Sequence, residues 1–151
     1  KMEVHLMVEK PEDLVQKWLE AGVERIIVHL ETVDREELRQ ILERADDIEV
    51  GLALKPETLV QDLEPYLEDI HFVQILGVQP GLSGQKFQTR VIEKIKWLKN
   101  HYQNVRIEVD GGIDLQTARL VGAAGADVIV SASYIFESDD PKRTFEELKN
   151  L

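Results

Sequence analysis

Short apolar runs alternate with longer amphipathic stretches along this chain of 151 residues. The runs are rich in valine and isoleucine, which predicts buried β-strands, and the amphipathic stretches between them predict helices. The expected strands are Glu3 to Val8, Arg25 to Leu30, Glu49 to Leu54, Phe72 to Val78, Arg106 to Asp110 and Asp127 to Ser131. Such regular alternation is typical of βα units around a parallel sheet.

Six helices are expected between and after these strands, and local start and stop signals support their bounds. The expected helices are Pro11 to Ala21, Asp34 to Ala45, Pro56 to Leu67, Thr89 to His101, Asp114 to Ala124 and Pro141 to Leu151. The prolines that suit a first helical turn are Pro11, Pro56 and Pro141, and the expected N-caps are Asp34 and Asp114. Gly22 and Gly125 follow apolar-periodic runs, where a left-handed residue commonly ends a helix.

No linker or change of composition interrupts the alternation, so we expect a single domain over residues 1–151. Six βα units in a row fit either an open doubly wound sheet or part of a closed barrel. A doubly wound nucleotide-binding fold usually carries a glycine-rich turn after its first strand. The first expected strand is followed instead by Glu9, Lys10 and Pro11, which favours the barrel.

The composition disfavours some partners. The formal net charge is −11, and both nucleic acid and anionic membrane surfaces need a basic patch. An anionic small ligand must therefore be held locally, by backbone amides and helix N-termini. No apolar run approaches the roughly 18 residues that cross a bilayer, and the chain has no cysteine. We expect a cytoplasmic protein with no nucleic-acid or membrane partner.

Polar residues gather where the expected strands end. In both candidate folds ligands bind at the carboxyl ends of parallel strands, so these residues are the candidates for chemistry. They are His5, His29, Lys55, Gln79, Asp110, Ser131 and Ser133.

Two of these residues have a structural and a chemical interpretation. His5 interrupts an apolar strand, where it is either a hydrogen-bonded core histidine or a neutral imidazole that ligates a divalent metal. Asp110 precedes Gly111 and Gly112. These three residues form either a common turn or a site in which the Asp110 carboxylate lies beside exposed backbone amides. For His29, beside Glu31, a structural role is favoured.

Two loops offer weaker candidates. The segment from Gln79 to Phe87 is glycine-rich and is either a simple turn or a loop that closes over a ligand. Ser131 and Ser133 follow the last expected strand, where barrels often hold phosphate on amides and hydroxyls.

Taken in order, five motifs resemble the ribulose-phosphate 3-epimerase family, and together they are far more specific than any one alone. The motifs are Val4-His5-Leu6-Met7-Val8 with Pro11, Val28-His29-Leu30-Glu31, Gly51-Leu52-Ala53-Leu54-Lys55-Pro56, Pro80-Gly81-Leu82-Ser83-Gly84-Gln85-Lys86-Phe87, and Ile107-Glu108-Val109-Asp110-Gly111-Gly112. The resemblance covers essentially the whole chain. It implies a TIM-barrel-like α/β fold, a (β/α)8 barrel represented here from its third to its eighth unit.

The resemblance also implies a reaction and a set of residues. The reaction converts D-ribulose 5-phosphate to D-xylulose 5-phosphate by metal-assisted proton transfer at C3, with Zn, Fe, Mn or Co as the divalent ion. His5 and Asp110 are similar in position to metal ligands, and Asp110 also to a catalytic acid/base. The residues that resemble substrate- or phosphate-binding positions are Met7, Gly81, Ser83, Gly84, Gly111, Gly112, Ala132 and Ser133.

One departure from the family pattern changes the expected activity. The family's first two strands carry a His-x-Asp motif that supplies two further ligands and the second catalytic carboxylate, and this chain has no counterpart. We therefore expect weak or absent metal binding, little or no epimerase activity of the chain alone, and a homo-oligomer that covers the open strand edges. The alternatives are a noncatalytic fragment that self-associates and at most binds an anion, and a sister barrel such as a hexulose-phosphate synthase.

Overall fold

The computed structural model describes residues 1–45, 48–81 and 85–151 and divides into two compact units. The first unit comprises residues 1–54 and 58–74, and the second comprises residues 55–57 and 75–151. The six strands follow their sequence order in the sheet, from β1 to β6. A doubly wound sheet places its first strand in the interior and reverses direction there, so the sequential order is that of a barrel.

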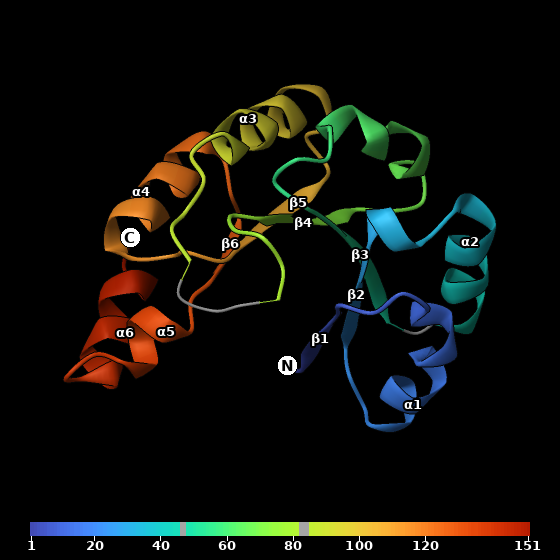
Figure 1. The fold of residues 1–151 in the computed structure, drawn as a ribbon, viewed down its shortest axis with the longest axis horizontal. Helices are drawn as coiled ribbons and strands as arrows, with labels where there is room; N and C mark the ends of the chain where they lie inside the picture. Colours follow the sequence, from blue (N-terminus) through green and yellow to red (C-terminus); the bar gives the residue numbers. More distant parts are fainter. Residues whose placement is uncertain (46–47, 82–84) are drawn as a thin grey trace. The chain divides into compact units, whose positions relative to one another are not determined.

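The first unit contains three strands in parallel register, β1 (Glu3–Leu6), β2 (Arg25–His29) and β3 (Glu49–Leu54). Figure 1 shows these strands in blue to dark green, with the helices α1 (Val15–Glu20) and α2 (Arg35–Arg44) on one side of them. The 3₁₀ helices of this unit are η1 (Pro11–Asp13), η2 (Leu30–Thr32) and η3 (Val60–Tyr66).

A tight apolar cluster fixes the centre of the first unit. Ile27, Ala53 and Phe72 are fully buried and pack together, one from each of three strands. Gly51 lets the Phe72 ring approach β3, because a Cβ at Gly51 would lie 2.8 Å from the Phe72 Cδ1 atom. The glycine of this strand is therefore explained by packing.

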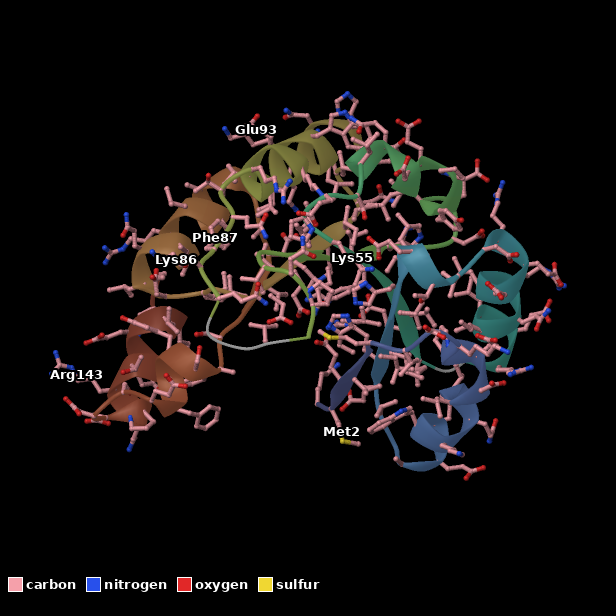
Figure 2. All side chains as sticks on the ribbon, in the orientation of Figure 1. Met2, Lys55, Lys86, Phe87, Glu93 and Arg143 are labelled. Carbon is pink, nitrogen blue, oxygen red and sulfur yellow. The ribbon has the colours of Figure 1, made fainter. Side chains whose placement is uncertain are left out.

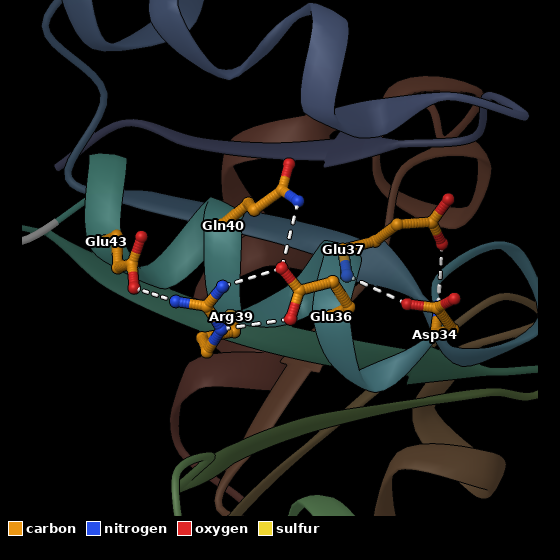
Figure 3. A network of polar contacts seen from close by, with 6 residues as sticks. All are labelled: Asp34, Glu36, Glu37, Arg39, Gln40 and Glu43. Atoms are coloured by element: carbon orange, nitrogen blue, oxygen red, sulfur yellow. Dashed lines mark hydrogen bonds and ion pairs between the residues drawn. The ribbon is translucent and has the colours of Figure 1, made fainter.

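Helix α2 begins as the sequence predicts. The Asp34 carboxylate accepts a hydrogen bond from the Glu37 amide at 2.9 Å, and the Glu37 carboxylate accepts one from the Asp34 amide at 2.7 Å. Figure 3 shows this capping box beside a surface network in which Arg39 binds Glu36 and Glu43. Arg39, Glu36 and Glu43 lie on the solvent-exposed face of α2. Exposed ion pairs of this kind are ordinary surface features and do not indicate a functional site.

The second unit contains β5 (Arg106–Asp110) and β6 (Val128–Val130), which pair in parallel. Its helices are α3 (Val91–His101), α4 (Leu115–Ala124), α5 (Ser133–Phe136) and α6 (Pro141–Lys149). Strand β4 (Phe72–Leu76) belongs to both units, because residues 72–74 lie in the first and residues 75–76 in the second. The single domain expected from the sequence stays a prediction.

Most predicted elements are confirmed, with differences that have local causes. The strands at residues 49–54 and 106–110 have the predicted bounds, and both predicted aspartate N-caps are present. The helix predicted from Pro56 is wrong: a 3₁₀ helix begins only at Val60 and contains Pro65, which has no amide hydrogen to donate. The helix predicted from Pro11 is split into η1 and α1. The short helix α5 was not predicted.

None of the helices in the described ranges combines the length and the apolar character needed to cross a bilayer.

Candidate functional site

The candidate metal ligand His5 lies in the middle of β1 and faces a second histidine. His5 pairs in register with Ile27 of β2, and His29 is two residues further on the same face of that strand. The Nε2 atoms of His5 and His29 are 2.9 Å apart. The ring centroids are 4.8 Å apart and the ring planes differ by 24°. The two imidazoles therefore share a hydrogen bond across the strands.

The second histidine is held on its other side by a carboxylate. His29 Nδ1 lies 3.0 Å from Glu31 Oε2, and the side chain of His29 is only 3% exposed. The other oxygen of Glu31 accepts a hydrogen bond from the Thr58 hydroxyl. Thr58, Glu31, His29 and His5 thus form one continuous polar chain within the first unit.

The electrostatics of His5 suit a neutral imidazole. Burial, followed by the nearby His29, lowers the pKa of His5 from 6.5 to about 4. At neutral pH the ring is uncharged, which is the form that ligates a divalent metal. Among residues 1–45, 48–81 and 85–151, no group of three or more histidine or acidic side chains gathers to hold an ion. The neutral ring nitrogen of His5 is nevertheless a donor type that fits a divalent metal.

Met7 lies one residue beyond the end of β1. Met7 is 49% exposed, so the chain presents an apolar side chain to solvent two positions after His5. This position agrees with a side chain at the mouth of a strand array, although contact with a substrate stays a prediction.

The second unit carries Asp110 at the last position of β5, followed by a tight glycine turn. The Asp110 carbonyl accepts a hydrogen bond from the Gly77 amide at 2.7 Å. Gly111 has φ of 98°, and a Cβ there would lie 2.5 Å from the Val78 Cγ2 atom. Both the backbone conformation and the lack of space require glycine at this position. The carboxylate is therefore placed at the end of the strand by a turn with little freedom.

Gly112 is held by the loop that precedes α3. Its φ is 69°, and an added Cβ would lie 2.8 Å from the Phe87 nitrogen and 2.9 Å from the Phe87 Cα. Gly77 makes a similar approach, since a Cβ there would meet the Phe87 ring at 2.7 Å. Figure 2 shows Phe87 and Lys86 on this loop, which leads into α3. The Asp-Gly-Gly turn and the Phe87 loop thus form one packed surface.

A cleft of about 700 Å³ opens beside this surface, entirely within the second unit. Gly112 and Ser133, two of the predicted phosphate-binding residues, both line it. The other lining residues are Gln85, Lys86, Phe87, Ile113, Asp114, Thr117, Tyr134, Glu137 and Ser138. The cleft therefore brings together the turn after β5 and the segment after β6, which are far apart in sequence.

The remaining predicted positions of the second unit either do not line this cleft or lie outside the residues that the structure describes. Gly81 is exposed with φ of 115°, and Ala132 precedes α5 with φ of −113°, a conformation that does not require glycine. Neither residue nor Gly111 is among the cleft's described lining residues. Ser83 and Gly84 lie outside the residues that the structure describes.

Two features of the site were not predicted. The pairing of His29 with His5 was missed, although both residues lie near the carboxyl ends of adjacent strands and the period of two puts them on one face. Thr117 was also missed: it lines the cleft and its hydroxyl donates to the Gly112 carbonyl at 3.0 Å. The Asp114-to-Thr117 spacing, typical of a capping box, was the available signal.

The sequential parallel strands place this chain in the class of TIM-barrel-like α/β proteins, which confirms the predicted fold class. A solved structure of this class, 3-hexulose-6-phosphate synthase from Salmonella typhimurium, has a TM-score of 0.76 at 19% identity, covering 92% of this chain and 66% of that one. At this identity the likeness concerns the fold alone.

Sequence comparison then gives the family. Residues 1–136 match the model of the ribulose-phosphate 3 epimerase family, so the chain belongs to that family. The ribulose-phosphate 3-epimerase of Chlamydia muridarum is 39% identical over 146 residues, which is 91% of this chain and 63% of the relative. The ribulose-phosphate 3-epimerase of Schizosaccharomyces pombe is 34% identical over 148 residues, which is 97% of this chain and 64% of the relative. The chain thus spans a little under two thirds of the length of these relatives.

Proposed function

We propose that this chain performs part of the proton transfer at C3 by which D-ribulose 5-phosphate and D-xylulose 5-phosphate are interconverted, with little or no complete epimerisation. Membership of the family supports a phosphorylated pentose as substrate. The observation that carries the proposal is the cleft of the second unit, because Gly112 and Ser133 meet there although they were assigned to phosphate from sequence alone.

The cleft has the donors that a phosphate needs. Gly111 and Gly112 both have positive φ values, and glycine turns are one kind of backbone in which successive amides can form an anion-binding concavity. The Ser133 hydroxyl and the Lys86 ammonium group line the same cleft. Lys86 brings a positive charge to a lining that also contains the carboxylates of Asp114 and Glu137. Met7, Gly81, Ser83, Gly84 and Ala132 remain proposed contacts of the substrate or its phosphate.

We propose His5 and Asp110 as the ligands of a divalent ion, Zn, Fe, Mn or Co. When bound, such an ion polarises the substrate carbonyl and makes the neighbouring C3 proton more acidic. His5 would offer a neutral ring nitrogen, in keeping with its lowered pKa. Asp110 would take or return the C3 proton from one face of the substrate.

With one catalytic carboxylate, we expect these 151 residues to perform only part of the reaction, proton exchange at C3 without inversion. Inversion at C3 needs a proton removed on one face and returned on the other, and the family's second catalytic carboxylate has no counterpart in this sequence. If Asp110 is the acid/base group on one face of the substrate, it exchanges the C3 proton with solvent and returns a proton to that same face. Little or no epimerisation should therefore accompany exchange.

The decisive experiment measures both outcomes at once. The chain is incubated with D-ribulose 5-phosphate in heavy water with excess Zn²⁺, a diamagnetic ion, and proton NMR follows the C3 resonance and the appearance of D-xylulose 5-phosphate. We expect deuterium at C3 of unchanged D-ribulose 5-phosphate, with little D-xylulose 5-phosphate. Asp110→Asn should reduce the exchange by about 10²-fold or more, the usual contribution of a positioned acid/base.

Asp139→Asn is the matched control, because Asp139 is an exposed carboxylate of the same unit and should leave exchange unchanged. Exchange that is equal in wild type and Asp110→Asn would contradict the proposal. Phosphate binding without any exchange would favour the alternative, a noncatalytic anion-binding protein. Rapid epimerisation would show that the second carboxylate is not needed.

Two further expectations belong to this proposal. Strands β1 and β6 stand at the two ends of the strand order, and an edge strand tends to be covered by another chain. We propose a homo-oligomer on this ground, which light scattering at micromolar concentration tests: a well-folded monomer would contradict it. A cytoplasmic location is proposed on composition.

A further inference from the structure

The two serines that follow β6 have different surroundings. Ser133 lines the cleft of the second unit, whereas Ser131 is not among the residues described in that lining. The hydroxyl of Ser131, a half-buried residue, donates a hydrogen bond of 2.8 Å to the Ile113 carbonyl. Ser131 therefore acts on the turn after β5, and Ser133 is the serine placed to contact a ligand in the cleft.

The Ser131 hydrogen bond joins β5 and β6 beyond the end of their backbone pairing. The parallel register of the two strands extends to Asp110 and Val130. Ser131 directly follows Val130, and its side chain reaches Ile113, which lies three residues after Asp110. One side-chain hydrogen bond thus ties together the two segments that line the cleft, past the point where the register ends.

The peptide group between Ile113 and Asp114 is held on both of its edges. Its carbonyl accepts from the Ser131 hydroxyl, and its amide donates to Thr117 Oγ1 at 2.8 Å. A trans peptide group is planar, and its carbonyl and amide point in opposite directions. Two hydrogen bonds on opposite edges therefore fix the orientation of the whole plane.

The preceding peptide group, between Gly112 and Ile113, is held on its carbonyl edge. Thr117 Oγ1 lies 3.0 Å from the Gly112 carbonyl oxygen and also 3.0 Å from Asp114 Oδ1. A hydroxyl has one proton to donate, so Thr117 divides it between these acceptors. The plane that Ser131 holds is therefore the firmer of the two, and it limits the conformations that Gly112 can adopt.

We propose that Ser131 is a positioning residue of the phosphate site, which holds the Ile113 carbonyl and thereby keeps Gly112 and Ser133 in place for an anionic phosphate group. This role rests on the proposed function, which supplies the phosphate. Groups that are already oriented before a ligand arrives bind it more tightly, because ordering them on binding costs free energy. Ser131 acts through the Ile113 carbonyl and makes no contact with the phosphate itself.

Titration with inorganic phosphate, followed by amide NMR of the ¹⁵N-labelled chain, measures this effect. We expect phosphate to shift the Gly112 and Ser133 amide resonances of the wild-type chain. Ser131→Ala should raise the Kd for phosphate about two- to tenfold, the range that the loss of one neutral hydrogen bond produces. Ser131→Cys, which keeps the shape of the side chain but has a weak donor, should change the Kd in the same direction. Ser131→Thr keeps the hydroxyl and should restore a Kd near the wild-type value.

Thr32→Val is the matched control, because the Thr32 hydroxyl also donates to a carbonyl at the end of a strand, that of His29, at 3.1 Å. Thr32 belongs to the first unit, whereas the cleft lies entirely within the second. We expect the Kd for phosphate to stay unchanged in this variant. An equal loss of affinity in Thr32→Val and Ser131→Ala would reveal a general loss of stability and would overturn the positioning role.

NMR relaxation of the ligand-free chain separates the positioning of the turn from phosphate binding. Ser131→Ala should lower the order parameter of the Gly112 amide on the ps–ns timescale, and Thr32→Val should not. Wild-type phosphate binding with an unchanged Kd in Ser131→Ala would overturn the positioning role and leave the proposed function intact. A wild-type chain in which phosphate leaves the Gly112 and Ser133 amides unperturbed would overturn the phosphate site of the proposed function, and the role of Ser131 with it.

Discussion

Two glycines of the second unit differ in what an added side chain would meet. Gly112 combines φ of 69° with an added Cβ 2.8 Å from the Phe87 nitrogen, so it faces both a conformational and a steric demand. Gly122, in the middle of α4, has ordinary helical geometry and no heavy atom within 4 Å of an added Cβ. Substitution by alanine should therefore have opposite effects on stability at the two positions.

Gly112→Ala should destabilise the chain by about 2–5 kcal/mol, because a left-handed alanine costs about 1–2 kcal/mol and overpacking costs about 1–3 kcal/mol. Gly122→Ala should instead stabilise it by about 0.5–1 kcal/mol, since alanine is the better helix former. Urea unfolding of both variants measures the two changes. A neutral Gly112→Ala would mean that the Phe87 loop does not pack on the turn.

Residue-scale prediction succeeded where a residue's role is local. Asp34 and Asp114 were predicted as N-caps because a cap depends only on the next three residues, and both form capping boxes. Gly112 and Ser133 were predicted to bind phosphate from the family resemblance, and both line the same cleft, although their role stays a prediction. The role of His29 was missed because it depends on a partner 24 residues away, across a strand pairing whose register the sequence does not state.

At the scale of elements, the first three strands are tied together at their amino ends by one arginine. Parallel register places Glu3, Arg25 and Glu49 side by side on β1, β2 and β3. The Arg25 guanidinium binds both carboxylates and lies 3.6 Å from the centroid of the Phe72 ring. With 18% of its side chain exposed, Arg25 is shielded more than an ordinary surface arginine.

Arg25→Met should destabilise the chain by about 1–2 kcal/mol, less than a fully buried pair because both carboxylates keep some exposure. The loss has two causes, the missing ion pairs and the mutual repulsion of Glu3 and Glu49. The matched control is Arg39→Met, since Arg39 also pairs with two glutamates but lies on the exposed face of α2 (Figure 3). That change should leave the stability nearly unchanged, because ion pairs between exposed side chains contribute little.

Urea unfolding of the two variants separates them, and equal effects would contradict the shielding argument. Adding Glu49→Gln to Arg25→Met should recover part of the loss, because it removes one of the two repelling carboxylates. No such recovery is expected when Glu43→Gln is added to Arg39→Met.

Element bounds were predictable where periodicity and caps agree, and not where proline chemistry intervenes. The runs at residues 49–54 and 106–110 are bounded by clear changes in polarity, and the structure gives the same bounds. The stretch after Pro56 has helical apolar spacing, but Pro65 interrupts the hydrogen bonds that a longer α-helix needs, and a 3₁₀ helix results. Spacing alone does not distinguish these helix types.

At the scale of the whole chain, the sequence predicted the barrel class through motif order, and the sequential strand order confirms it. It predicted a single domain because no linker interrupts the βα alternation. The structure divides into two compact units whose common element is β4, and the single domain stays a prediction. Because β4 belongs to both units, unfolding of either unit would leave part of this strand unpaired and expose its backbone groups.

The two tryptophans test this coupling, because Trp18 lies in the first unit and Trp97 in the second. Trp97→Phe leaves Trp18 to report on the first unit, and Trp18→Phe leaves Trp97 to report on the second. If β4 joins the units into one cooperative domain, the fluorescence transition of each variant in urea should coincide with that variant's own circular dichroism transition. A fluorescence midpoint in either variant that differs from its circular dichroism midpoint would identify two independently unfolding domains, since a cooperative chain has one midpoint whichever unit is observed.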